Sequence, residues 1–371
     1  MKKTLLSVAG LAVAVAIAVV LIKKTPSGQA TFEVATIAPL TGTAAEVGKG
    51  NVDGARLALR DISATQAVRW QLTVEDSKSS PKDAVQAVNA VWAKTTPKVV
   101  MTHQGPVSAA LAPTIATHGA VMLYIAATDA PKAVHPLAFR IYPDPAYVAR
   151  QTVDQIIAPA KVARLALFYV NDEFGVPVAK AIRDSAAQSN ITLAFDEGYN
   201  AATTDFRPTL GKLLTVDAQA LYIVGIGAPL GRVISQAREA GFTRLIASGP
   251  ELQFADVLKN AGGAAEGAQF LDLGFDPDAT TEPTKSFVAR YTAEYNARPT
   301  VASALVYDGW MIVSRAVGNS PSATPAEIAA SMIKLGQHDG LCGQIKITAA
   351  HDFVYPLTRK TIRNGRPVAE P

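Results

Sequence analysis

The sequence predicts a two-lobed α/β protein built on parallel β-sheets, and three observations lead to this fold class. First, from residue 32 onward, short β-rich runs alternate with segments of helix length. Second, most of these runs are almost continuously apolar, which is typical of parallel strands covered on both faces. Third, the alternation breaks at residues 140–145 and again at 273–283. The chain is therefore expected to pass between two lobes more than once.

Alternation of strand and helix implies parallel strands that are joined by right-handed crossovers. The expected strands are Phe32–Ala38, Trp70–Glu75, Val99–Thr102, Val121–Ile125, Ala163–Val170, Ile191–Glu197, Ala220–Val224 and Arg244–Ala247. The expected helices are Gly50–Ile62, Lys82–Ala93, Pro177–Gln188, Leu230–Ala240, Thr284–Asn296 and Ser303–Gly318. Ser80-Pro81 is a typical helix start and Gly241 a typical helix end.

The two breaks differ in character. Residues 140–145 read Arg-Ile-Tyr-Pro-Asp-Pro, an extended segment interrupted by prolines, which suits a crossing strand between lobes. Residues 273–283 are irregular and precede further helices, and a β-rich tail begins at Cys342. Because Cys342 is the single cysteine, it cannot form an internal disulfide, and we interpret it as a buried small apolar residue.

The charge of the chain argues against a nucleic-acid partner. The 35 basic and 31 acidic residues give a net charge of +4, but four lysines and no acid lie in residues 1–30. The remainder therefore carries 31 basic and 31 acidic residues. A neutral body lacks the clustered basic face that phosphate binding requires.

Residues 5–22 are uncharged and almost wholly apolar and follow two lysines, as in the hydrophobic region of a secretory signal peptide. Small residues at Gly28 and Ala30 permit cleavage after Ala30. The stretch also approaches the length of a membrane-spanning helix. Residues 1–30 are therefore interpreted as either a signal peptide or a retained N-terminal anchor, and both place the body outside the cytoplasmic membrane.

Motifs of enzymes and metal sites are missing from the sequence. It contains no phosphate loop of the Gly-x-x-x-x-Gly-Lys-Ser/Thr type, no Gly-x-Ser-x-Gly elbow and no His-Glu-x-x-His. The five histidines show no metal-ligand spacing, and His103 is expected to be solvated or hydrogen-bonded. Asp172-Glu173 is expected to be a solvated turn that caps the next helix. We therefore expect no catalytic residue, no cofactor and no metal.

Four loops at the carboxyl ends of expected strands remain as the candidate binding site, because ligands of open α/β sheets bind there. They are 39–50, 103–108, 126–130 and 248–251. The glycines of the first loop are interpreted as a turn whose backbone N–H groups face a cleft. A hydroxyl from Ser108 or Thr128, next to free N–H groups at a helix start, would bind a carboxylate. Glu251 would supply the opposite charge for an ammonium group.

At these same loops the chain resembles periplasmic solute-binding proteins of the leucine/isoleucine/valine type, which serve ABC importers. The likeness runs from Phe32 to about Val368. Its landmarks, in order along the chain, are Ala38-Pro-Leu-Thr-Gly with Gly48 and Asp53-Gly54-Ala55, Asp76 with Pro81-Lys-Asp-Ala-Val, Gly105-Pro106-x-Ser108, Ala126-Ala127-Thr128, Gly249-Pro250-Glu251 and Tyr307-Asp308-Gly309.

The resemblance implies a type I periplasmic binding fold, with two Rossmann-like parallel-sheet lobes joined by three crossings. We assign residues 31–141 and 276–345 to the first lobe, and residues 142–275 and 346–371 to the second. It also implies that the protein is a periplasmic monomer whose partners are a small solute and a membrane permease.

The resemblance further implies site residues. The stretch Ala126, Ala127 and Thr128 would bind the carboxylate and ammonium of a ligand. The loop with Gly105, Pro106 and Ser108 would lie beside it, although Pro106 and Ser108 depart from the usual serine run. Glu251 would pair with the ammonium, and Phe174 and Ile226 would contact the ligand from the same second lobe.

Two departures argue against a branched-chain ligand. Ile226-Gly227 and Val47 stand where relatives often carry aromatic residues, while Phe174 remains as an aromatic of the cleft. The family's disulfide is also missing, since Ser79 and Gly105 lie near the places of its cysteines.

Three classes of function stay open at this point. The first is capture of a small amino acid or amino-acid-like solute by closure of the lobes, with no chemistry performed on it. The second is a membrane-anchored sensor of the same fold, and a binder of a plain carboxylate or amide is a variant of the first. The third, a hydrolase or amidase, would need a nucleophile and a base within reach, and no such pair is seen.

Overall fold

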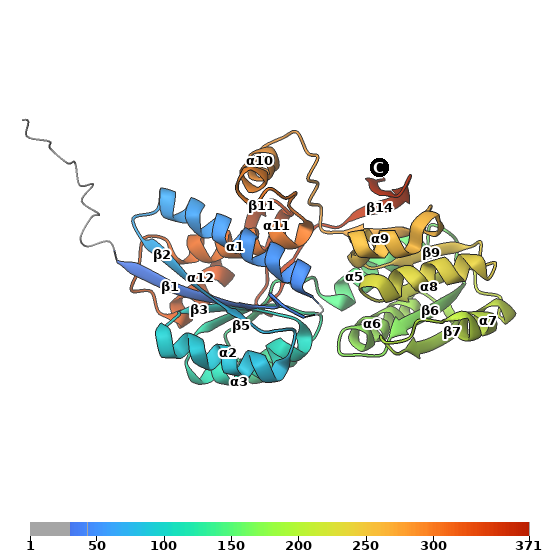
Figure 1. Ribbon diagram of the computed structural model, residues 1–371, viewed down its shortest axis with the longest axis horizontal. Helices are drawn as coiled ribbons and strands as arrows, with labels where there is room; N and C mark the ends of the chain where they lie inside the picture. Colours follow the sequence, from blue (N-terminus) through green and yellow to red (C-terminus); the bar gives the residue numbers. More distant parts are fainter. Residues whose placement is uncertain (1–29, 43, 371) are drawn as a thin grey trace, which may run out of the picture.

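The computed structural model describes residues 30–42 and 44–370. The expected signal peptide or anchor, residues 1–30, lies outside these residues apart from Ala30. Two α/β lobes lie side by side along the long axis of the molecule, and extended segments join them near the middle (Figure 1). In the described part of the chain, no helix combines the length and the apolar character needed to cross a membrane.

The first lobe is built on a five-stranded parallel sheet with strand order β2-β1-β3-β4-β5. Its strands are β1 (Thr31–Ala38), β2 (Arg69–Asp76), β3 (Val99–His103), β4 (Val121–Ile125) and β5 (Ala138–Arg140). The helices between them are α1 (Ala45–Thr65), α2 (Pro81–Lys94), α3 (Gly105–Thr117) and α4 (Ala130–Val134). Because the strands are parallel, the loops that follow β1, β3 and β4 share one edge of the sheet.

The second lobe is built on a seven-stranded sheet with order β15-β14-β10-β9-β8-β6-β7, in which β14 and β15 run antiparallel to their neighbours. Its strands are β6 (Arg164–Val170), β7 (Thr192–Tyr199), β8 (Ala220–Val224), β9 (Leu245–Ser248), β10 (Gln269–Asp272), β14 (Thr358–Arg363) and β15 (Arg366–Ala369). Its helical segments are α5 (Pro145–Thr152), the π-helix η1 (Val153–Ile157), α6 (Gly175–Gln188), α7 (Arg207–Thr215), α8 (Gly227–Glu239), the 3-10 helix η2 (Pro250–Gln253), α9 (Ala255–Ala261) and the 3-10 helix η3 (Gly262–Ala265).

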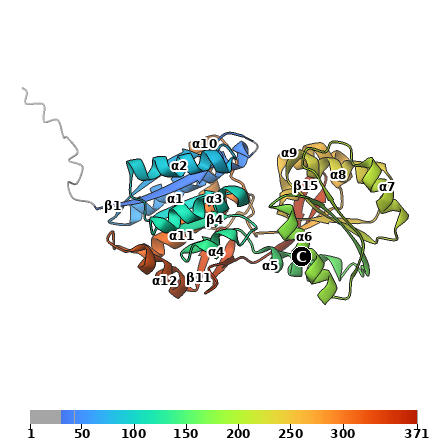
Figure 2. The ribbon, with the colours of Figure 1, turned by 90° about the horizontal axis from the view of Figure 1, so that it is seen from below.

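Each sheet is covered by helices on both faces, which explains the continuous apolar runs. In β1, Phe32 and Val34 pack into one core with α1 and α11, whereas Ile37 packs into the opposite core with α2 and α3. In β6, Phe168 faces α8 and α9, and Leu167 faces α5 and α6. Figure 1 shows α1 on one face of the first sheet and α2 and α3 on the other, and Figure 2 views the molecule from the side of α2 and α3. The expected strands are confirmed, each within two residues of its predicted ends.

The chain returns to the first lobe after β10. Helices α10 (Thr284–Tyr295), α11 (Val301–Val317) and α12 (Pro325–Leu335) are followed by a small antiparallel sheet. Its strands are β11 (Gln337–Gly340), β12 (Gly343–Ile347) and β13 (Phe353–Val354). Side chains from β12 and β13 join the core that contains Phe32 and Trp310. Cys342 lies in the same core and is fully buried, as expected.

The division into lobes at residues 141/142, 275/276 and 345/346 stays a prediction. The hydrophobic packing favours a later third boundary, because Ile347, Phe353 and Tyr355 belong to the first core. The first strand of the second sheet that follows these residues is β14. We therefore propose that the third crossing lies between Tyr355 and Thr358.

The crossing at residues 140–145 is tied to residues 352–355, which lead into the third crossing. The Tyr355 hydroxyl donates to the carbonyl oxygen of Ile141 at 2.7 Å. Arg140 and Asp352 form an isolated parallel β-bridge, and the Arg140 Nε lies 2.8 Å from Asp352 Oδ1. Arg140 also contacts Asp144, the residue that caps α5. The segment around residues 140–145 is therefore held by Asp352 and Tyr355 as well as by its own helix.

The expected start of the first helix was wrong. Gly48 and Gly50 are not turn residues but lie inside α1, which begins at Ala45. A Cβ on Gly48 would come 1.9 Å from the carbonyl oxygen of Pro39, so the glycine allows the helix to approach the loop after β1. The start of α2 is confirmed, since the Ser80 side chain accepts from the Asp83 backbone N–H and Pro81 is the first helical residue.

Candidate functional site

The loops after β3 and β4 lie close to each other and to the loop after β6 of the second lobe. A Cβ on Gly105, at the start of α3, would lie 3.4 Å from Thr128 Cγ2 and 3.9 Å from the carbonyl oxygen of Glu173. Glu173 belongs to the loop after β6, so the carboxyl ends of both sheets face each other here. The structure thus brings together two of the loops predicted from sequence, and places a third segment opposite them.

The first of these loops offers backbone donors and little else. Gly105 and Pro106 begin α3, and Pro106 has no backbone N–H, so Gly105 and Val107 carry the free donors of the helix start. The Ser108 hydroxyl is fully buried and lies 2.9 Å from the hydroxyl of Thr102. That hydroxyl already has a partner inside the lobe, so the backbone N–H groups are the donors that this loop can offer to a ligand.

The second loop places a hydroxyl group near Gly105. Ala126 and Ala127 are buried, and Thr128 is half-buried at the end of the loop. The Thr128 Oγ1 accepts from the backbone N–H of Ala130 at 3.2 Å. Because this oxygen acts as the acceptor, the hydroxyl hydrogen of Thr128 is free to be donated to a ligand.

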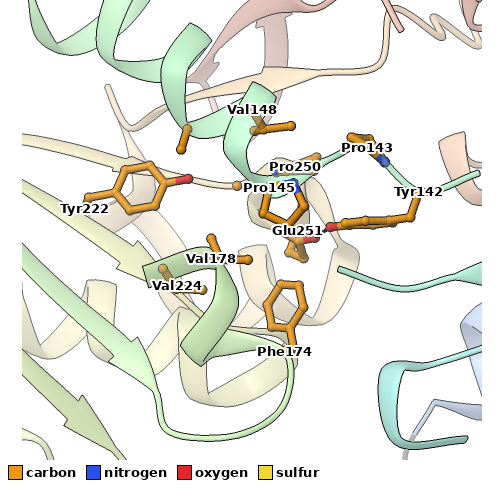
Figure 3. Close-up of a pocket in the computed structure, with 12 residues that line it drawn as sticks. Tyr142, Pro143, Pro145, Val148, Phe174, Val178, Tyr222, Val224, Pro250 and Glu251 are labelled. Carbon is orange, nitrogen blue, oxygen red and sulfur yellow. Dashed lines mark hydrogen bonds between the residues drawn. The ribbon is translucent and has the colours of Figure 1, made fainter. Parts of the chain in front are cut away.

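A pocket opens in the second lobe (Figure 3). Glu251 and Phe174 line it, and Phe174 is the chain neighbour of Glu173, whose carbonyl oxygen approaches Gly105. Most of the other lining side chains are apolar. The complete lining is Tyr142, Pro143, Pro145, Val148, Ala149, Phe174, Val178, Tyr222, Val224, Gly249, Pro250 and Glu251.

Glu251 is a buried acid in these apolar surroundings. Its side chain is 6% exposed, and the Tyr142 hydroxyl donates to Glu251 Oε1 at 2.6 Å. Burial raises the pKa of the Glu251 carboxyl, and the negative charge of Asp272 raises it further. The hydrogen bonds from Tyr142 and from the backbone N–H of Glu251 act in the opposite direction. A cationic group of a ligand would compensate this carboxylate.

A glycine makes room for the Glu251 side chain. Gly249 precedes the 3-10 helix η2, and a Cβ at this position would come 2.3 Å from Glu251 Oε2. The carboxylate therefore folds back over its own backbone, where the amide hydrogen can reach it. A glycine two residues before Glu251 is therefore needed for this position of the carboxylate.

Ile226 and Val47 are placed at the surface. Ile226 is 49% exposed and caps α8, and Val47 is 37% exposed in the first turn of α1. Neither lines the pocket. The roles that the resemblance implies for the predicted site residues stay predictions, and for Ile226 the described packing offers no contact that supports one.

Two secondary expectations have clear outcomes. His103 is buried and hydrogen-bonded to Thr36 and Asn51, so its expected hydrogen-bonded role is confirmed. Burial lowers the pKa of His103 to about 3, which keeps the ring neutral. Asp172 Oδ1 accepts from the backbone N–H groups of Phe174 and Gly175, which confirms the expected capping turn before α6.

Sequence reasoning missed Tyr142 and Tyr222. Tyr142 lies in the crossing 140–145, whose extended character was recognised while its tyrosine was not considered. Tyr222 lies in β8, where it looked like an ordinary core residue. A single tyrosine in a proline-rich crossing between the lobes could have indicated that Tyr142 lies at the site. The sequence pattern of strand β8 gives no indication that Tyr222 does.

Comparison with known proteins agrees with this geometry. A family model described as "Periplasmic binding protein" matches residues 31–358. The Leu/Ile/Val-binding protein of Escherichia coli (strain K12) is 26% identical over 243 residues, which cover 64% of this chain and 66% of that protein. The chain therefore spans just under two thirds of the length of this relative.

Solved structures share the fold. The substrate-binding protein LivJ from Streptococcus pneumoniae, in complex with isoleucine, has a TM-score of 0.79 at 21% identity, over 92% of this chain and 100% of that chain. An ABC-transporter solute-binding protein from Rhodopseudomonas palustris BisB5, in complex with 3,4-dihydroxybenzoic acid, has a TM-score of 0.78 at 19% identity, over 92% and 97%. The fold class expected from the sequence is thereby confirmed.

Proposed function

Because the chain belongs to the periplasmic binding protein family, we propose that it captures a small amino acid or amino-acid-like solute outside the cytoplasm and delivers it to an ABC-type permease. The names of its relatives describe solute binding rather than catalysis. We therefore propose that the protein binds and releases its ligand without changing it chemically. A monomer is sufficient for this role, since the residues proposed for the site all come from one chain.

The observation that carries the proposal is the buried carboxylate of Glu251. It lies in an apolar pocket, and the charged residue that acts on it is Asp272, which has the same sign. A buried charge is costly unless it is paired. An ammonium group of the ligand would provide the missing partner.

The opposite end of the ligand would bind to the first lobe. The backbone N–H groups at the start of α3 and the Thr128 hydroxyl can donate to a carboxylate. The solute would dock there first, and the second lobe, with Phe174 and Glu251, would then close over it by hinge motion at the crossings. Closure would remove water from both charged groups, so both must be paired in the closed complex.

Replacing Glu251 by glutamine tests the ammonium contact. We expect the variant to lose about 1.5–3 kcal/mol of binding free energy for an amine-bearing ligand, because a charge-assisted hydrogen bond is lost. Little change is expected for a plain acid. Isothermal titration calorimetry against a panel of amino acids and short carboxylic acids measures both. Glu173→Gln is the matched control, because Glu173 is an exposed acid that does not line the pocket.

Two calorimetric results would contradict the proposal. Binding of a nucleotide or sugar, together with no binding of any amino acid or carboxylic acid, would refute the solute class. Binding of an amino acid with equal affinity by wild type and Glu251→Gln would refute the role of Glu251.

A plain carboxylic acid is the second candidate ligand. Glu251 also supports this candidate. Burial in the apolar pocket raises the pKa of its carboxyl group, which favours the protonated form. A protonated Glu251 would tolerate a ligand that carries no cation. The relative that is complexed with 3,4-dihydroxybenzoic acid shows that this fold accepts such a ligand in that protein. The calorimetric panel separates the two candidates.

The fate of residues 1–30 decides between a free carrier and a tethered receptor. We propose a location outside the cytoplasmic membrane for either form. Intact-mass measurement of the protein isolated from its native host distinguishes them, because loss of about 30 residues indicates a cleaved signal peptide. A full-length mass in the membrane fraction would support the tethered sensor instead.

A further inference from the structure

We propose that Tyr142 is a positioning residue of the binding site, whose hydroxyl holds the Glu251 carboxylate in the orientation that receives the ammonium group of a ligand. This inference rests on the proposed function. It adds a residue from the crossing between the lobes to a site otherwise made by the lobes themselves.

The contact itself is short and direct. The Tyr142 hydroxyl lies 2.6 Å from Glu251 Oε1, within the range of a charge-assisted O–H···O hydrogen bond. Figure 3 shows the two side chains approaching each other at the edge of the pocket. Burial raises the pKa of Tyr142 well above its ordinary value, and Glu251 adds to this, so the phenol keeps its proton and acts as the donor.

Glu251 has few other partners. The titratable groups that face it are Tyr142 on the crossing, Tyr222 on β8 and Asp272 on β10. The other elements that line the pocket, α5 and the start of α6, contribute no titratable side chain to it. Their lining residues are Pro145, Val148, Ala149, Phe174 and Val178. In the described part of the chain, the Tyr222 hydroxyl makes no hydrogen bond to Glu251. Tyr142 is therefore the one neighbouring side chain in these residues whose hydrogen bond favours the ionised form of Glu251.

The carboxylate is held from two sides and keeps room for a ligand. Tyr142 holds Oε1, and the absence of a side chain at Gly249 lets Oε2 lie back against the backbone. A carboxylate offers about four lone-pair directions. The Tyr142 hydroxyl and the backbone N–H of Glu251 use two of these directions. The others are left for an ammonium group.

The backbone that carries Tyr142 is itself restrained. Its neighbour Ile141 accepts a 2.7 Å hydrogen bond from the hydroxyl of Tyr355, which leads into the third crossing. Arg140, one residue earlier, is bound to Asp352 and Asp144. Pro143 follows Tyr142 and limits its backbone to extended conformations. A donor on such a restrained segment loses little entropy when it holds another side chain in place.

Replacing Tyr142 by phenylalanine removes the donor and retains the ring. In the ligand-free protein we expect the pKa of Glu251 to rise by about one to two pH units, since the lost hydrogen bond favours the charged form. Nuclear magnetic resonance of protein labelled at glutamate 13Cδ measures this pKa directly, with Glu251→Gln used to assign the signal. Tyr199→Phe is the matched control, because it removes a different buried tyrosine hydroxyl, which donates to the Val224 carbonyl.

The same variant is expected to change ligand binding in a pH-dependent way. Glu251 must be ionised to pair with an ammonium group, so affinity is lost as the pH falls through its pKa. With the pKa raised, this loss should begin about one to two pH units higher in Tyr142→Phe than in wild type. Near the midpoint, affinity for an amine ligand should be about tenfold lower, whereas a purely structural defect would lower it equally at every pH.

The outcomes separate this inference from the proposed function. An amine ligand bound equally by wild type and Tyr142→Phe at every pH, with an unchanged Glu251 pKa, would overturn the role of Tyr142 alone. A Glu251 pKa that rises as expected, in a protein that binds no amine, would overturn the proposed amine ligand, while the hydrogen bond would still be shown to hold the carboxylate.

Discussion

Replacing Arg140 by methionine is expected to lower the free energy of unfolding by about 3 kcal/mol. The Arg140 side chain is 3% exposed, and its guanidinium lies 2.8 Å from Asp352, 2.9 Å from Asp144 and 3.2 Å from Asp129. Methionine keeps most of the apolar volume but removes the buried guanidinium from Asp144 and Asp352, which are partly buried, and from Asp129, which is exposed. The loss is expected at the lower end of the range for buried ion pairs, because Lys132 also contacts Asp352 and Asp129.

Urea denaturation of wild type and variant measures this loss. Arg150→Ala is the matched control, since Arg150 forms an exposed pair with Asp154 one helical turn away. That variant should change the stability by less than about 0.5 kcal/mol. Adding Asp144→Asn to Arg140→Met should recover part of the stability, because it removes a carboxylate that has lost its guanidinium partner and keeps a residue that can cap α5. If Arg140→Met and Arg150→Ala changed the free energy of unfolding equally, the ion pairs of Arg140 would contribute no more than an exposed pair.

The Asp308 carboxyl is expected to make the protein less stable as the pH rises from about 4 to about 7. Asp308 lies in α11, is fully enclosed, and accepts the backbone N–H groups of Leu341 and Cys342 at 2.8 Å each. Burial raises its pKa to about 7, although these hydrogen bonds oppose the shift. An unfolded chain would release the proton near pH 3.9. Between these values the folded state holds a proton that the unfolded state has lost.

The sign of the effect follows from proton linkage. Where the folded state binds more protons, the free energy of unfolding falls with increasing pH. For a shift of about three pH units the contribution amounts to about 4 kcal/mol, complete below pH 4 and lost above pH 7. Asp308→Asn removes this titration. Urea denaturation of both proteins from pH 4 to 8 should therefore show a wild-type advantage that shrinks as the pH rises, and parallel curves would contradict the expectation.

Much of the fold follows from local patterns. The strands β1, β3, β4, β6 and β8 are short apolar runs bounded by turns, and such runs predict buried parallel strands wherever they occur. Ser80-Pro81 and Gly241 mark helix ends through backbone chemistry that involves only near neighbours. These features are visible without knowledge of what lies nearby in space.

Features that depend on distant contacts were not visible in this way. Gly48 resembles a turn residue in the sequence, and only the approach of Pro39 explains why a helix carries it. The segment 346–355 looked like part of the β-rich tail of the second lobe, yet Phe353 and Tyr355 pack into the first core. In both cases the deciding neighbour is remote in the sequence or belongs to another element.

The sequence by itself determined the two-lobed parallel α/β class, the neutral body and the strand-end loops with Thr128 and Glu251, because strand periodicity, charge and loop position are local properties. Only the tertiary structure decided what surrounds Glu251. Tyr142 is 109 residues away in the chain, and the environment of a buried charge depends on distance through space, where hydrogen bonds and burial act, rather than along the chain.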